Sequence, residues 1–121
     1  HVVDESATLS LAEAGAAIDV IFEELKQNGK KVLAAASKMV AKTGVKFDTA
    51  LVESVGMRVA DQITAEAKRW RADLIVIGTH GRRGMQRLLM GSDAEMVVRN
   101  TEVPVLLTHG PREKTGVPAS R

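Results

Sequence analysis

The sequence of 121 residues contains no cysteine and no tyrosine, and aromatic residues make up only 2% of it. The absence of cysteine excludes disulfides, thiolate metal sites and cysteine nucleophiles. With so few aromatic side chains, the core has to be built from aliphatic residues and alanine. No apolar run resembles a membrane span or a signal peptide. We expect no membrane partner.

The sequence also lacks a strong excess of charge of either sign, because 17 basic residues face 15 acidic ones. A net charge of +2 is too small to argue for a nucleic-acid partner. Lys68, Arg69 and Arg71 form a small basic cluster around the only tryptophan, Trp70. We interpret the cluster as solvated and Trp70 as a packing residue at a helix end, and we predict no nucleic-acid partner.

The chain is long enough for one hydrophobic core, and its content of 45% hydrophobic residues is typical of a globular protein. We predict a single domain over residues 1–110, followed by a flexible polar tail over residues 111–121. The sequence opens on "HVVDES" without methionine, and this opening resembles the end of a strand. We therefore expect an N-terminally incomplete domain, preceded by further residues.

Apolar periodicity predicts that strands and helices alternate along the chain. A capping-box pattern at Ser10 and Glu13 precedes an apolar stripe at helical spacing, which predicts one long helix to about Thr43 despite a weak point at Gly29. The other predicted elements are a strand at "HVVD", a strand over Val45–Val52, a helix over Met57–Trp70, a strand at "DLIVI", a helix at "SDAEMVVRN" and a last strand at "VPVLLT". This order predicts an open parallel α/β sheet, in which ligands bind beyond the carboxyl ends of the strands.

The segment after "DLIVI" has the chemistry of a phosphate-binding loop. Gly78, Gly81 and Gly91 allow the backbone to approach a ligand closely, and Ser92 stands at a helix start, where N–H groups and the helix dipole favour an anion. Three arginines and no acidic residue lie between Gly78 and Ser92. The spacing differs from both well-known glycine-rich nucleotide motifs. "SDAE" is also a capping box, in which Ser92 and Glu95 have a structural role.

The spacing Gly78-x2-Gly81-x9-Gly91-Ser92, with "ADLIVIGTHGRRG", "LLMGSDAE" and "NTEVPVLL" around it, resembles the nucleotide-binding branch of the universal stress protein family. The resemblance covers nearly the whole chain. It implies a Rossmann-like parallel sheet of order 3-2-1-4-5, whose first strand and helix are missing from this sequence. It also implies a homodimer, formed through the last strand, Val103–Leu107.

The resemblance further implies that the ligand is ATP or AMP, with or without Mg²⁺. By that resemblance Gly78, Gly81, Gly91 and Ser92 line the phosphates and ribose, the backbone at Val2 meets the adenine, and Ile77 flanks it. His80 and Arg82 lie in the loop between the glycines. We interpret His80 as a hydrogen-bonding loop residue, because no carboxylate partner is near it in sequence.

Asp93 directly follows Ser92 and would repel a nearby phosphate unless Arg82 or a metal ion intervenes. Three functions are compatible with these features. The first is a cytoplasmic stress-response regulatory protein that binds an adenine nucleotide. The second is a dimerisation or adaptor module that binds no nucleotide, which Asp93 favours. The third is an enzyme acting on ATP, which ranks last because the sequence shows no catalytic set and no metal-ligand cluster. At most, we expect slow ATP hydrolysis.

Overall fold

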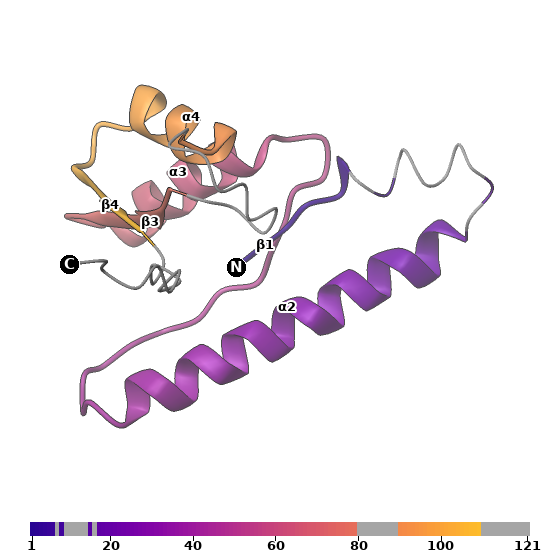
Figure 1. Cartoon of the computed structure of the whole chain (residues 1–121), viewed down its shortest axis with the longest axis horizontal. Coiled ribbons are helices and arrows are strands. Elements are labelled where there is room, and N and C mark those ends of the chain that lie inside the picture. Colours follow the sequence, from indigo (N-terminus) through magenta and orange to yellow (C-terminus); the bar gives the residue numbers. More distant parts are fainter. Residues whose placement is uncertain (7, 9–14, 16, 80–89, 110–121) are drawn as a thin grey trace, which may run out of the picture. The chain divides into compact units, whose positions relative to one another are not determined.

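A computed structural model describes residues 1–6, 8, 15, 17–79 and 90–109 of the chain. The chain divides into two compact units, His1–Glu66 and Ala67–Arg121. The described elements, in chain order, are β1 (Val2–Val3), α2 (Ile18–Ala41), β2 (Val52–Glu53), α3 (Val59–Trp70), β3 (Ile75–Gly78), α4 (Ser92–Asn100) and β4 (Val105–Thr108) (Figure 1). The predicted alternation of strands and helices is confirmed.

The four described strands form two parallel ladders. In the first unit β1 pairs with β2, with Val2 opposite Val52. In the second unit β3 pairs with β4 from Ile75 opposite Val105 to Gly78 opposite Thr108. The predicted order counts the missing first strand as strand 1, so β1 and β2 are its strands 2 and 3, and β3 and β4 are its strands 4 and 5. The two ladders are therefore the 3-2 and 4-5 pairs of that order. Within the described residues they remain two separate sheets. The α/β class with parallel strand pairing is confirmed.

The predicted strand over Val45–Val52 is wrong for most of its length, because the ladder with β1 includes only Val52 and Glu53. Val45 and Phe47 are 61% and 42% exposed. Strand-forming residues alone do not make a strand where no neighbouring strand accepts their hydrogen bonds. Figure 1 shows that this segment instead returns beside α2 as an extended connection toward β2.

Helix α2 is a single helix of 24 residues, as predicted. The predicted start at Ser10 is wrong, because the N-cap is Ala17, whose backbone is extended at φ −70° and ψ 102°. Ser10 and Glu13 of the predicted capping box lie outside the described residues. Gly29 is its one buried residue. A Cβ atom at Gly29 would lie 2.7 Å from Leu51 Cδ1 and 2.8 Å from His1 Cδ2. Glycine therefore leaves room on α2 for the side chains of Leu51 and His1, which flank the β1–β2 ladder.

Polar contacts join the helices of the first unit to β2. Lys26 Nζ on α2 lies 2.7 Å from Glu53 Oε1 and 5.4 Å from the ring centroid of Phe22. Gln62 Nε2 on α3 donates to the Glu53 carbonyl at 3.4 Å. The buried Ser54 hydroxyl donates to Val3 O at 3.0 Å and so links the ends of the two strands. Glu53 and Ser54 thus connect β2 to α2, to α3 and to β1.

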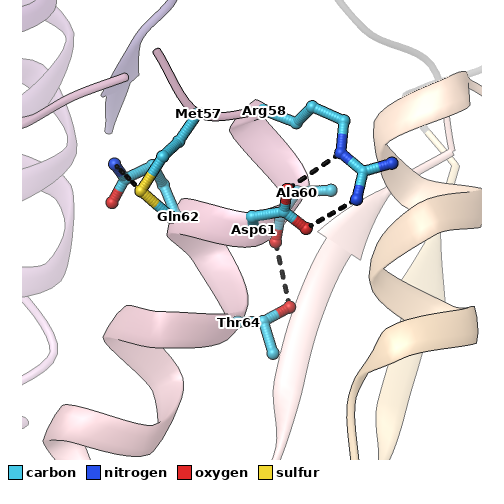
Figure 2. Close-up of polar contacts among 6 residues, drawn as sticks. All are labelled: Met57, Arg58, Ala60, Asp61, Gln62 and Thr64. Atoms are coloured by element: carbon cyan, nitrogen blue, oxygen red, sulfur yellow. Dashed lines mark hydrogen bonds and ion pairs between the residues drawn. The ribbon is translucent and has the colours of Figure 1, made fainter. Parts of the chain in front are cut away.

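The first turn of α3 carries local polar contacts, shown in Figure 2. Arg58 holds Asp61 through two hydrogen bonds, from Nε at 2.8 Å and from a terminal nitrogen at 3.2 Å. Thr64 Oγ1 donates to the carbonyl of Ala60 at 2.9 Å. Ala60 is only 1% exposed, so its small side chain faces the core while the charged pair stays at the surface. This division is typical of an amphipathic helix.

The second unit begins where α3 ends in a left-handed turn. The Arg71 N–H donates to Lys68 O and the Ala72 N–H to Ala67 O, with Arg71 at φ 54°. This is a Schellman arrangement with arginine at the position that usually holds glycine. The prediction that Trp70 packs at this helix end is wrong, because Trp70 is 64% exposed. The core of this unit is aliphatic, as predicted.

The core of the second unit includes the buried residues Ile75, Ala94 and Val97. Among the described residues, no helix is long and apolar enough to cross a membrane. The tail over residues 111–121 lies outside the described residues, and the division into a single domain and a tail stays a prediction.

A Gly29→Leu substitution should lower the free energy of unfolding by about 1–2 kcal/mol, because overpacking at the helix–ladder contact outweighs the gain in helix propensity. Urea unfolding measures the change. Ala35→Leu is the matched control, since Ala35 is exposed on the same helix, and should change stability by less than about 0.5 kcal/mol. Equal effects of the two substitutions would contradict the close approach at Gly29.

The hydrogen bond and charge of Glu53 raise the pKa of Lys26 above its ordinary value of 10.5. The pair's contribution to stability is therefore complete below about pH 10.5 and is lost as the pH rises through the higher pKa of the folded state. The difference in Tm between wild type and Lys26→Gln should be constant from pH 7 to 9 and should shrink by pH 11.5. Thermal unfolding followed by circular dichroism checks this, and a difference that grows with pH would contradict the pairing.

Candidate functional site

The candidate site lies where β3 ends and α4 begins. The Thr79 N–H donates to Thr108 O at 2.9 Å, which extends the β3–β4 ladder by one residue. The Thr79 carbonyl accepts a hydrogen bond of 2.7 Å from the Gly91 N–H. Thr79 is only 7% exposed, whereas Gly78 before it is exposed. One buried residue therefore joins the end of the sheet to the start of α4.

The N-terminus of α4 has no side-chain cap. Gly91 is the N-cap, at φ −59° and ψ 149°, and Ser92 is the first helical residue. The Glu95 N–H donates to Gly91 O at 3.0 Å, which closes the first turn. Gly91 thus occupies the position at which Ser, Thr, Asp or Asn would normally accept hydrogen bonds from the first-turn amides. Its φ is open to any residue, so backbone strain does not require glycine here.

The predicted capping box of Ser92 and Glu95 is wrong. That motif needs serine at the N-cap and the acid three residues later. Here the N-cap is Gly91, one residue before Ser92. Glu95 instead pairs with Arg99 at i+4, with a hydrogen bond of 3.0 Å from Arg99 Nε and a second contact of 2.9 Å. The Glu95 carboxylate is therefore held by Arg99, and Ser92 is left at an exposed position in the first turn.

Asp93 is the acidic residue that most affects an anion at this helix start. It is exposed in the first turn of α4, and within the described residues it forms no ion pair. An acidic side chain here stabilises the helix dipole, and the same charge opposes the approach of a phosphate. The buried side of the helix, formed by Ala94 and Val97, anchors this turn to the core of its unit.

The structure brings together Gly78, Gly91, Ser92 and Asp93 among the predicted site residues, through Thr79. Ile77 lies half-buried in β3, and Val2 lies in β1 of the first unit. His80, Gly81 and Arg82 lie outside the described residues. Sequence reasoning missed Thr79. Its signal is a small polar residue directly after a buried strand and before a glycine-rich loop.

Metal chemistry finds no support in the described part of the chain, where no group of three or more His, Asp or Glu side chains is placed to hold a metal ion. The involvement of Mg²⁺ therefore stays a prediction. The arrangement that is present, an uncapped helix start beside the end of a parallel strand, suits an anion.

The fold and this site define an α/β protein with parallel strands and a glycine-rich connection between the last two of them. The chain belongs to the universal stress protein family, whose model matches residues 1–109. It is 39% identical over 114 residues to universal stress protein MJ0531 of Methanocaldococcus jannaschii, covering 94% of this chain and 65% of that protein. It is 32% identical over 90 residues to universal stress protein YxiE of Bacillus subtilis, covering 74% and 59%. The chain thus spans less than two thirds of the length of these relatives.

Solved structures agree with this fold. The hypothetical protein MJ0577 has a TM-score of 0.78 at 23% identity, covering 93% of this chain and 74% of that one. The hypothetical protein PH0823 has a TM-score of 0.66 at 23% identity, covering 94% and 75%. At these identities the likeness concerns the fold. It confirms the Rossmann-like α/β class predicted from the sequence.

The assignment of the N-cap is tested by two substitutions with opposite expectations. Ser92→Ala should change the free energy of unfolding by less than about 0.5 kcal/mol, whereas loss of a true serine cap costs about 1 kcal/mol. Gly91→Asn should raise stability by a few tenths of a kcal/mol, because asparagine supplies the missing cap. Chemical denaturation measures both. A loss of 1 kcal/mol or more in Ser92→Ala would restore the capping box.

Proposed function

We propose that the protein is a cytoplasmic stress-response regulator that binds ATP or AMP at the start of α4. The observation that carries the proposal is the uncapped first turn. Gly91 supplies no side chain, and its N–H is held by Thr79 O at 2.7 Å, so the following amides remain at an accessible helix N-terminus. Amides in this position, together with the helix dipole, bind phosphate.

The neighbouring residues support the same ligand. Gly78, exposed at the end of β3, lets a ligand approach the backbone closely. The Ser92 hydroxyl is not used as a helix cap and is available to a phosphate or ribose oxygen. By analogy with the family, the loop containing His80, Gly81 and Arg82 contacts the phosphates, and Ile77 and Val2 contact the adenine. Membership of the universal stress protein family supports the regulatory role.

The proposal includes a homodimer formed through Val103–Leu107. Within the described residues β4 pairs only with β3, which leaves its other edge for a second copy. Leu106 and Leu107 are 51% and 36% exposed, so this strand presents apolar side chains as well as backbone groups. Pro104 lies before the first residue of β4, so it interrupts no ladder position from Val105 onward.

ATP at a hundredfold excess over its Kd should stabilise the protein by about 2.7 kcal/mol, measured as a thermal shift with ATP and with AMP. Gly91→Asn should reduce the affinity at least tenfold, because its side chain occupies the amides that would hold the phosphate. Asp93→Asn should strengthen binding several-fold, because it removes a negative charge from the first turn. Isothermal titration calorimetry gives each Kd.

Gly44→Asn is the control, since it makes the same change at the end of α2 and should leave the Kd unaltered. Native mass spectrometry of the same samples reports bound nucleotide and the number of subunits. Absence of any shift at millimolar ATP and AMP would refute the nucleotide proposal. A dimer without nucleotide would then favour the adaptor function, and a monomer would refute the β4 interface.

A further inference from the structure

A second surface, independent of the nucleotide site, lies on α2 in the first unit. Charge is segregated along the sequence, because residues 25–47 contain six lysines and no acidic residue. This leaves 11 basic against 15 acidic residues in the rest of the chain. A small net charge therefore hides a strongly basic segment. Lys26 is engaged by Glu53 at 2.7 Å, and the other five lysines are exposed.

The helix gathers four of these lysines on one side. At 100° per residue, Lys30, Lys31, Lys38 and Lys42 fall within an arc of about 120°. Lys42 is the C-cap, but its backbone is still helical at φ −69° and ψ −18°, so it continues the same phase. We call these four residues the lysine face. In the described part of the chain none of the four forms an ion pair.

The lysine face points away from the β1–β2 ladder. Gly29 marks the side of α2 that packs against the ladder, and Lys38 follows it by nine residues, or about 180° around the helix. Ala34 and Ala35 lie between the lysines and are exposed. The outward side of the helix is therefore a smooth ridge of ammonium groups separated by methyl groups. From Lys31 to Lys42 it extends about 16 Å.

Helix stability alone does not account for this pattern. Cations interact favourably with the helix dipole only within the last turn, where Lys38 lies, whereas Lys30 and Lys31 are in the middle of α2. Lys38 and Lys42 are spaced i, i+4, where like charges destabilise a helix. No acid on this half of the helix compensates that repulsion, although Asp19, Glu23 and Glu24 are present on the first half. A polyanionic partner would relieve it.

We propose that the lysine face binds the phosphate backbone of double-stranded nucleic acid without sequence preference. The ridge matches the axial length of about five base pairs, and ammonium groups contact phosphates as point charges. It carries no aromatic side chain on which single-stranded bases would stack. Val32 and Met39 beside it are 47% and 71% exposed, but two apolar side chains do not make up the broad apolar face by which amphipathic helices enter lipid. The expectation of no nucleic-acid partner rested on the small net charge and on a solvated cluster around Trp70, and neither of these describes the charge on α2.

The test is fluorescence anisotropy of a labelled 24-base-pair DNA duplex of mixed sequence, titrated with the full chain from 50 to 200 mM KCl. Log Kobs should fall linearly with log salt, with a slope of about −3 to −4 for four phosphate contacts. The triple variant K31Q/K38Q/K42Q should weaken binding at least tenfold at 50 mM KCl and reduce the slope by about 3. A second duplex of unrelated sequence should bind with the same affinity.

The matched control is K68Q/R69Q/R71Q, which removes the same net charge around Trp70 and should retain wild-type affinity. Gly91→Asn should also retain it, which separates this result from the fate of the nucleotide proposal. Equal losses in both triple variants would show that net charge alone acts and would overturn the proposal. Binding to vesicles containing phosphatidylserine, or to polyglutamate, as tightly as to the duplex would overturn it as well. Circular dichroism verifies that each variant keeps its helix content.

Discussion

The backbone hydrogen bond from the Gly91 N–H to the Thr79 carbonyl is the constraint on which the second unit depends. It joins two points separated by eleven intervening residues, so it closes the glycine-rich connection at its base. Thr79 is itself held by Thr108 at the end of the β3–β4 ladder, and α4 is anchored through Ala94 and Val97. The anion site proposed at this helix start gains affinity when the helix start is ordered before the ligand arrives, because ordering it during binding costs affinity. The ladder and the buried face of α4 provide that order.

Much of this architecture is predictable from the sequence. Helix α4 has the predicted bounds, the long helix continues through Gly29, and the two last strands lie beside each other in parallel. The two helices depend on apolar periodicity, which is a local property of the sequence, whereas the pairing of the last two strands was implied by the resemblance to the family. The spacing of the glycines likewise indicated where the strand ends and the helix begins.

The errors arose where a tertiary partner decides the outcome. The segment over residues 45–51 has the composition of a strand, but only Val52 and Glu53 join a ladder. Trp70 has the large apolar side chain of a core residue, yet it is exposed at the end of α3. Ser92 and Glu95 fit a capping box by spacing, and a shift of one residue in the N-cap removes it. The Glu95 carboxylate instead forms an ion pair with Arg99. Residue type predicts which positions can form a strand, a core contact or a helix cap. The residues that surround each position in the folded chain determine which positions do so.

The left-handed turn at Arg71 has a consequence for how β3 is oriented. A non-glycine residue in this region costs of the order of 1–2 kcal/mol, so the turn persists only because hydrogen bonds on both sides, to Ala67 and to Lys68, fix it. The direction in which the chain leaves α3 is therefore set by backbone geometry, and no large side chain is needed to wedge it in place. The side chains around Trp70 are therefore not needed to position β3 by packing. Their sequence can vary while β3 enters its sheet in the same direction.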